Sequence, residues 1–245
     1  MNKHDDGRLF LVSTPIGNLE DITLRALNVL READLIAAED TRHTRRLLTH
    51  FDIHSRLTSF HAFNEHGKCD ALLDEVAAGA RVALVSDAGT PGIADPGFLL
   101  VREARKRNVP VTVVPGVSAL TFAAVASGLP IDRLAFYGFP PVKSGRRRKF
   151  FERVAAEDKT VFLYESPFRI SSALAEIVAC GGERRLIALV REATKLHEEV
   201  IYGPAGEIQA RTAERNWKGE FVIGVAAIDA GDEDSVEYLG ETDGK

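Results

Sequence analysis

Two segments of the second half place charged side chains directly after apolar runs, where acid–base chemistry is possible. "YESPFR" follows "TVFL", and "REATK" follows "RLIALV". A lysine whose pKa is lowered by burial, or a carboxylate hydrogen-bonded to a hydroxyl, can accept a proton. The candidate catalytic residues are therefore Glu165, Arg169, Glu192 and Lys195. An ion-pair network that stabilises the domain is the alternative for the "REATK" residues.

Three turns rich in glycine and proline also follow apolar runs. "STPIGNLED" comes after "LFLV", "SDAGTPGIADPG" after "RVALV", and "PGVSA" after "VTVV". In an open α/β sheet, the loops at the carboxyl ends of the strands form the ligand crevice. Glycine lacks a Cβ, so a ligand can lie against the backbone, and proline holds a loop in a fixed shape. The loops predict one main-chain binding site, with three ordinary tight turns as the alternative.

Several motifs are absent, and their absence narrows the chemistry. The chain has no GxxxxGK[ST] loop, no GxGxxG followed by an acidic residue, and no GxSxG elbow. ATP hydrolysis, dinucleotide redox chemistry and serine hydrolysis are therefore disfavoured. His50 and His54 lack a third ligand, and the two cysteines, Cys69 and Cys180, form no CxxC spacing, so no metal site is predicted.

Two basic segments are candidate RNA contacts. In "EDTRHTRR", Asp40 or Thr41 is expected to cap a helix, because Asp and Thr are favoured at that position. Arginine forks match phosphate oxygens, and a helix N-terminus adds donors. The candidates are Arg42, His43, Arg45 and Arg46 there, and Arg146, Arg147 and Arg148 in "KSGRRRK". Solvated helix faces are the alternative, and Asp40 and Arg42 are also candidates for ribose or dimer contacts.

The elements that must position these residues alternate between short apolar runs and amphipathic stretches. This α/β alternation predicts a mostly parallel sheet covered on both faces in the first half. In the second half, "EEVIYGP" and "GEFVIGVA" are expected to form an antiparallel pair. We place the domains at 1–114 and 115–229, because Pro115 and Gly116 end a strand before a helix. The acidic stretch 230–245 is predicted to be a disordered tail.

Composition is that of an ordinary globular protein. The 245 residues are 45% hydrophobic and 27% charged, with a formal net charge of -5. The amino-terminal "MNKHDDGR" lacks the apolar core of a signal peptide, and no stretch of eighteen apolar residues occurs. We expect a cytoplasmic protein that neither crosses nor binds a membrane.

Eight segments together identify a resemblance to a known family. "TPIGNLEDITLRAL", "AEDTRHTRRLL", "LVSDAGTPGIADPG", "PGVSAL", "YGFPP", "YESPFRI", "REATKLHEE" and "KGEF" occur in this order. They resemble the bacterial 16S ribosomal RNA (cytidine-2'-O)-methyltransferases of the tetrapyrrole methylase superfamily. The resemblance covers about residues 8 to 226.

The resemblance implies an α/β fold of two domains, with a mostly parallel first sheet and a mixed second sheet. It further implies a homodimer that binds S-adenosylmethionine between its domains and methylates the ribose of a decoding-centre cytidine. The partner would be 16S rRNA within the small ribosomal subunit. By resemblance and loop chemistry, the cofactor residues would be Pro15, Gly17, Asp87, Gly89, Thr90, Ile93, Asp95, Ser118 and Ala119. For Asp87, capping of a turn is an equal alternative.

The chain departs from the family pattern at two places. The segment "FHAFNE" has Phe63 where relatives usually carry a second histidine, so no role passes to that ring. The chain also ends in an acidic tail where relatives often continue into a small helical region. Two other functions stay open: methylation of a porphyrin precursor, and a regulator that binds the cofactor without turnover.

Overall fold

The computed structural model describes residues 7–228, and the chain separates into two compact units that meet between Ala119 and Leu120. The boundary expected at residue 115 therefore lies a few residues upstream of the one between these units. The predicted acidic tail, 230–245, lies outside the described residues. Within 7–228, no helix is long and apolar enough to span a bilayer.

The first unit is built on a five-stranded sheet in the order β3-β2-β4-β1-β5. All its strand pairs are parallel. The strands are β1 (Arg8–Val12), β2 (Leu35–Ala38), β3 (Arg56–Ser59), β4 (Arg81–Val85) and β5 (Val111–Val114). The central strands β2, β4 and β1 are buried on both faces, as expected for a covered parallel sheet, whereas the edge strands β3 and β5 are only partly buried. The predicted parallel α/β architecture is confirmed, and every strand ends at the same edge.

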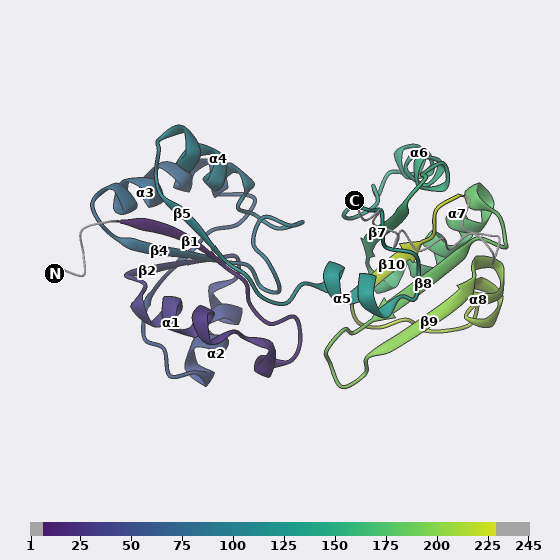
Figure 1. Ribbon diagram of the computed structural model, residues 1–245, viewed down its shortest axis with the longest axis horizontal. Helices are drawn as coiled ribbons and strands as arrows, with labels where there is room; N and C mark the ends of the chain where they lie inside the picture. Colours follow the sequence, from purple (N-terminus) through teal and green to yellow (C-terminus); the bar gives the residue numbers. More distant parts are fainter. Residues whose placement is uncertain (1–6, 229–245) are drawn as a thin grey trace, which may run out of the picture. The chain divides into compact units, whose positions relative to one another are not determined.

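Helices cover the two faces of this sheet in pairs (Figure 1). One pair is α1 (Leu24–Glu32) and α2 (Thr41–His50), and the other is α3 (Glu65–Ala77) and α4 (Phe98–Lys106). A short 3-10 turn, η1 (Leu19–Asp21), precedes α1. Alternate strand residues divide between two apolar clusters, for example Phe10 and Val12 toward α1, and Leu9 and Leu11 toward α3 and α4.

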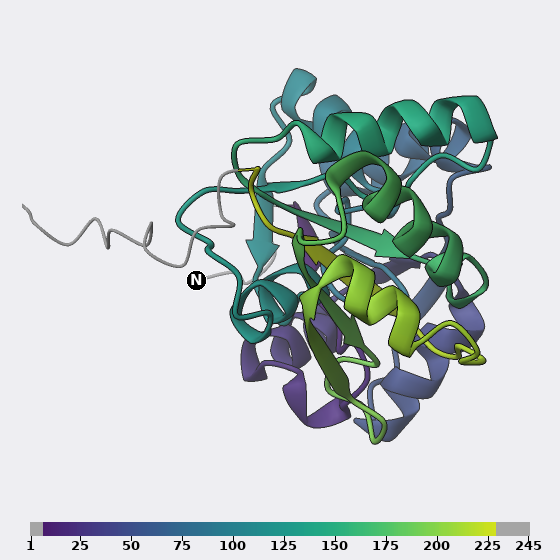
Figure 2. The ribbon, with the colours of Figure 1, turned by 90° about the vertical axis from the view of Figure 1, so that its right-hand side faces the viewer.

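The second unit contains a mixed sheet in the order β6-β7-β10-β8-β9. The strands are β6 (Leu134–Phe136), β7 (Thr160–Glu165), β8 (Leu186–Arg191), β9 (Glu199–Pro204) and β10 (Phe221–Val225). The helices are α5 (Ala119–Ala126), α6 (Ser144–Ala155), α7 (Ile170–Gly181) and α8 (Ala205–Arg211), with a 3-10 turn η2 (Pro167–Arg169). Figure 2 looks onto the sheet face that α6, α7 and α8 cover.

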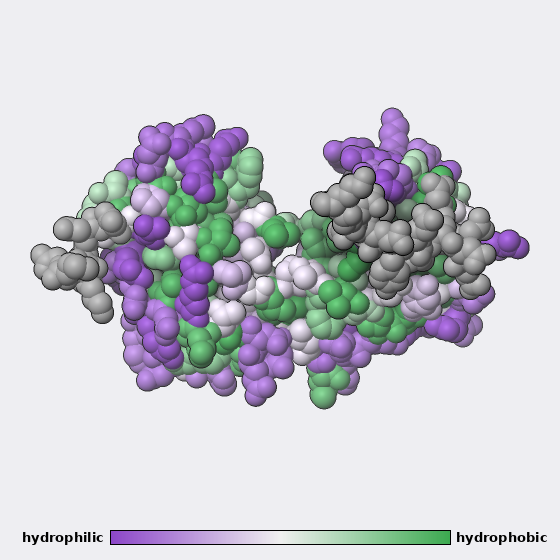
Figure 3. Space-filling model, viewed as in Figure 1, coloured by the Kyte–Doolittle hydropathy of each residue, from purple (hydrophilic) through white to green (hydrophobic). Residues whose placement is uncertain are grey.

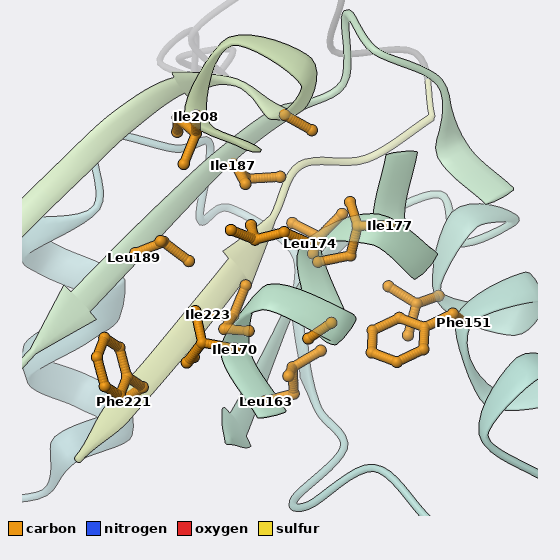
Figure 4. Packing of buried hydrophobic residues seen from close by; sticks show 14 of the residues in the cluster. Phe151, Leu163, Ile170, Leu174, Ile177, Ile187, Leu189, Ile208, Phe221 and Ile223 are labelled. Carbon is orange, nitrogen blue, oxygen red and sulfur yellow. The ribbon is translucent and has the colours of Figure 1, made fainter. Parts of the chain in front are cut away.

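A single apolar core joins these helices to the sheet. Leu163 and Ile223 from the strands pack with Leu174 and Ile177 of α7 and Phe151 of α6 (Figure 4). All five are buried, with at most 3% of their surface exposed. This core fixes where the strands end, and so where the following loops begin.

The expected pairing of the last two strands is wrong. β9 pairs with β8, whereas β10 lies between β7 and β8 and is antiparallel to both. The physical reason is burial: all five residues of β10 are buried, which requires a central position, whereas β9 exposes Val200 and Tyr202 as an edge strand does.

The register brings three motif loops to one edge of the second sheet. Phe221, at the start of β10, lies opposite both Glu165 at the end of β7 and Arg191 at the end of β8. Tyr164 N–H donates to the Gly138 carbonyl at 3.0 Å, so the segment after β6 lies beside β7. "YGFPP", "YESPFR" and "REATK" therefore follow neighbouring strand ends, and we call this the motif edge.

Candidate functional site

The three glycine-rich loops of the first unit meet at the carboxyl edge of its sheet. Thr14 and Gly89 exchange two backbone hydrogen bonds, of 2.9 and 3.0 Å. The hydroxyls of Ser13 and Thr90 are 3.0 Å apart. A Cβ on Gly116 would lie 2.8 Å from the Cβ of Ser13, so only glycine allows this approach. The loops after β1, β4 and β5 thus form one surface, as the sequence predicts.

The residues expected to hold the cofactor differ in exposure. Pro15 and Gly89 are buried within the loop junction, whereas Gly17 and Ile93 are exposed. Gly89 has a φ of +76°, a backbone conformation that L side chains rarely adopt. The half-buried members are Asp87, Thr90, Asp95, Ser118 and Ala119.

Three carboxyl groups crowd the same edge. Partial burial raises the pKa of Asp95 to about 6, and the carboxylates of Glu39 and Asp87 add to the rise, although a hydrogen bond with Ser86 opposes it. Burial followed by repulsion from Asp87 also raises the pKa of Glu39. The carboxyls of Asp95 and Glu39 are therefore harder to ionise, first because they are partly buried and then because their neighbours are negative. Such a site favours a cationic ligand.

Asp87 also has a structural role. Its Oδ1 accepts a hydrogen bond of 2.9 Å from the backbone N–H of Asp40. Asp40 in turn caps α2, accepting from the N–H of Arg42 at 2.8 Å, which confirms the predicted helix start. The Asp87 side chain thus positions the residue that caps α2, whereas capping of its own turn was one of the two roles that the sequence suggested.

The segment "FHAFNE" contains one fixed ring, that of His61, and one exposed ring, that of Phe63. His61 is tied to Asn64, whose side-chain oxygen accepts from the His61 N–H at 2.8 Å. Nδ1 of His61 is buried without a hydrogen-bond partner among the described residues. Phe63, by contrast, is 98% exposed. An apolar ring therefore stands in solvent at this position.

The basic residues of α2 lie on one exposed face. Arg42, Arg45 and Arg46, together with Thr49 and His50, line an open surface hollow. Their spacing of three and four residues places them on one side of the helix. His43 is exposed as well but does not line the hollow. Arg42 pairs with Asp40 at 3.3 Å.

In the second unit, Glu165 is buried in an ion-pair cluster. Its Oε1 accepts from Ser166 N–H at 2.7 Å and from Arg169 Nε at 2.8 Å. Nη2 of Arg147 lies 2.8 Å from Oε2, without the alignment of a hydrogen bond, and the two side chains are only 8% and 0% exposed. Glu165 therefore joins α6 to the segment after β7 and is not accessible to a substrate.

The three arginines at the start of α6 differ in burial and in ion pairing. Arg147 points into the core of its unit, whereas a solvated face was one of the two expectations. Arg148 is exposed and paired with Glu152 at 3.1 Å. Of the three arginines, only Arg146 is exposed and makes no ion pair with another described residue. We therefore leave Arg147 and Glu165 out of any proposed substrate contact.

Glu192 and Lys195 form a second cluster at the motif edge. Nζ of Lys195 donates to Glu192 and to Glu220, each at 2.9 Å. Burial lowers the pKa of Lys195, but these two hydrogen bonds raise it by more than burial lowers it, so the net shift is upward. Burial raises the pKa of Glu192, yet the bonds from Lys195 and the Glu220 N–H lower it overall. Both groups are held in their charged forms.

Gly219 leaves the space that the Glu192 side chain occupies in this second cluster. Its φ is +95°, and a Cβ there would lie 2.5 Å from Cγ of Glu192. Glu192 itself has a φ of +51°, in the left-handed region. Backbone strain of this kind is retained only where the surroundings dictate it.

Sequence reasoning missed Glu39, Glu65 and Gly219. Glu65 is buried and accepts from the N–H groups of Gly97 and Leu99 at the start of α4, at 3.0 and 3.3 Å. Two of these residues lie in segments that the sequence analysis had singled out: Glu39 directly precedes the predicted helix cap, and Gly219 is the glycine of "KGEF". Nothing in the local pattern shows, however, that Glu65 reaches a helix 32 residues away along the chain.

Comparison with known proteins agrees with this geometry. The model of the tetrapyrrole (corrin/porphyrin) methylases matches residues 8–209. "Ribosomal RNA small subunit methyltransferase I" of Escherichia coli O157:H7 is 47% identical, over 94% of this chain and 82% of that protein. The protein of the same name from Synechocystis sp. is 44% identical, over 90% and 79%.

Among solved structures, diphthine synthase has a TM-score of 0.67 and 18% identity, covering 90% of both chains. At that identity the likeness concerns the fold alone. The match of the family model and the identity to whole relatives lead to one conclusion: the chain belongs to the tetrapyrrole (corrin/porphyrin) methylase family, among the proteins named ribosomal RNA small subunit methyltransferase I.

Proposed function

We propose that this protein transfers a methyl group from S-adenosylmethionine to the 2'-oxygen of a cytidine ribose in the decoding centre of 16S rRNA. The observation that carries the proposal is the 47% identity to a ribosomal RNA small subunit methyltransferase I over 94% of the chain. The working unit is a homodimer, and the substrate is an assembled small ribosomal subunit.

The junction of the three glycine-rich loops fits this cofactor. S-adenosylmethionine supplies the methyl group on a positively charged sulfonium and also carries an ammonium group. Asp95 and Glu39 lie near the Asp87 carboxylate, and repulsion among these groups adds to burial in raising the pKa of both. A cation bound beside them would relieve that repulsion. The loops bring exposed backbone at Gly17 and Gly92, and the apolar side chain of Ile93, to the same edge.

The residues of the motif edge then handle the substrate hydroxyl. Because Lys195 remains an ammonium, its role is to donate a hydrogen bond and orient the ribose, not to accept the proton. The Glu192 carboxylate, only 17% exposed, is the candidate acceptor. Arg169, one-third exposed and located after β7, is the candidate phosphate contact at the motif edge.

The basic face of α2 serves the RNA backbone. Arg42, Arg45 and Arg46 line one hollow, which matches a phosphate run better than scattered charges would. Arg146 on α6 is a second contact of the same kind.

The test is transfer of labelled methyl from S-adenosylmethionine to small subunits isolated from a strain that lacks the enzyme, followed by mapping of the label. Label on a cytidine 2'-oxygen supports the proposal. Label on a porphyrin precursor and none on subunits would replace it with tetrapyrrole methylation. Cofactor binding without transfer to either would favour a regulator.

A further inference from the structure

Two phenylalanine rings stand in solvent at the motif edge. Phe168, in η2, is 95% exposed, and Phe139, in the segment after β6, is 54% exposed. β6 and β7 are parallel neighbours, so both rings follow adjacent strand ends. Exposure of large apolar rings costs solvation free energy unless a ligand covers them.

Contacts within the second unit hold the Phe139 ring and the segment that carries Phe168. The Phe139 ring packs on Tyr164 at 5.5 Å between centroids, and Tyr164 packs on Phe136 at 4.8 Å, both edge to face. The segment that carries Phe168 is fixed by Glu165, which accepts from Ser166 N–H and from Arg169 Nε. The buried carboxylate therefore presents the ring on a rigid base, which reduces the entropy lost when a ligand binds.

The charge around the rings is strongly positive. Segments 137–149 and 164–172 together contain six basic residues and one carboxylate, a net charge of +5 in a chain of net charge -5. That carboxylate, Glu165, is buried against Arg147 and Arg169. Lys143, Arg146 and Lys149 are exposed and form no ion pair within residues 7–228. Hydrophilic side chains gather over α6 in Figure 3.

Exposed aromatic rings among unpaired cations are the pattern of single-stranded nucleic-acid recognition. Bases stack on the rings while lysine and arginine contact the backbone. Duplex RNA keeps its bases stacked internally and offers no free face to such a ring. A protein partner of matching apolar shape would not require the excess of cations.

We propose that Phe139 and Phe168 form a stacking platform for unpaired bases of the RNA substrate, with Lys143 and Arg146 on the adjoining phosphates. The proposal rests on the proposed function for the identity of the RNA, but it concerns binding and not methyl transfer. It assigns recognition of the unpaired strand to the second unit and to residues outside the cofactor loops.

The test uses the full chain and a short single-stranded RNA that carries 2-aminopurine at a central position and fluorescein at one end. Fluorescence polarisation at fixed low salt gives the affinity, and quenching of 2-aminopurine reports stacking. We expect Phe168→Ala and Phe139→Ala each to weaken binding about 5- to 150-fold and to abolish the quenching. Ile131→Ala is the matched control, because Ile131 is 40% exposed and precedes β6, at the opposite edge of the sheet.

Each outcome separates the two proposals. Unchanged affinity and quenching in the phenylalanine variants, equal binding of a duplex of the same sequence, or no binding of the single strand by the wild type would overturn the platform. So would a change of oligomeric state in the variants with RNA affinity retained, because the rings would then belong to a protein interface. Phenylalanine-dependent binding without methyl transfer to subunits would uphold the platform and refute the proposed activity.

Discussion

Replacing Glu165 with glutamine tests the buried ion pair most directly. The substitution keeps the shape of the side chain and an oxygen that can still accept from Ser166 N–H and Arg169 Nε. It removes the negative charge that lies 2.8 Å from Arg147. Arg147 stays charged and buried, with Nη1 already lacking a hydrogen-bond partner.

The magnitude follows from that unbalanced charge. Removing one partner of a buried ion pair costs about 3–5 kcal/mol, because the remaining ion cannot be hydrated. Two of the three contacts of Glu165 survive in the variant, so we expect about 3 kcal/mol, the lower end of this range. Glu152→Gln breaks the Arg148 pair, whose side chains are 57% and 53% exposed, and should cost at most about 0.5 kcal/mol.

The assay is urea unfolding followed by tryptophan fluorescence. Trp217 is the single tryptophan of the chain and is buried against Phe221 in the second unit, with ring centroids 5.2 Å apart. Its signal therefore reports the unit that contains Glu165. A midpoint shift at constant slope measures the change in the free energy of unfolding.

Equal, small losses in Glu165→Gln and Glu152→Gln would refute the reasoning, since the buried pair would then contribute no more than the exposed one. A double variant, Glu165→Gln with Arg147→Met, adds a second check. It should recover much of the lost free energy because the uncompensated charge is gone.

Three further variants have specific expected outcomes. Asp95→Asn should weaken binding of cationic S-adenosylmethionine more than binding of neutral S-adenosylhomocysteine. In the wild type, the preference for S-adenosylmethionine over S-adenosylhomocysteine should fade as pH falls through about 6, because Asp95 becomes neutral there. The same variant should raise the melting temperature at pH 7.5 but not at pH 4, since the elevated pKa disfavours the folded state only once the carboxyl ionises. Gly219→Ala should displace Glu192 and lower methyl transfer at least about tenfold, with cofactor affinity unchanged in calorimetry. Arg45→Gln should reduce the salt slope of RNA binding by about 0.7–0.9.

Matched variants separate these effects from general damage. Gly182→Ala also places a side chain at a positive φ, +87°, but its new Cβ would meet nothing within 4 Å, so activity should be retained. Arg105→Gln removes an equally exposed arginine from α4 and should leave the salt slope unaltered. Loss of activity in the first, or an equal change of slope in the second, would remove the specific roles of Gly219 and Arg45.

Local sequence patterns were sufficient to predict the sheet of the first unit and the meeting of its three glycine-rich loops. The alternation of apolar strands and amphipathic helices predicted its parallel sheet, because parallel strands buried on both faces leave that periodicity in the sequence. The glycine and proline content of the three turns predicted their role, since a close approach such as that of Gly116 to Ser13 requires a missing Cβ. The start of α2 was predicted from Asp40 or Thr41, and the structure shows that Asp40 is the cap.

The sequence by itself determined the family, the first sheet, the meeting of the three loops and the basic face of α2, all of which depend on residue type and short spacing. Only the tertiary structure decided the insertion of β10 between β7 and β8, the burial of Arg147 against Glu165, and the close approach of Glu192 to Gly219. These contacts join residues 18 to 64 positions apart in the chain. Pairing across such distances is chosen by burial and charge compensation over the whole unit, which no local pattern records.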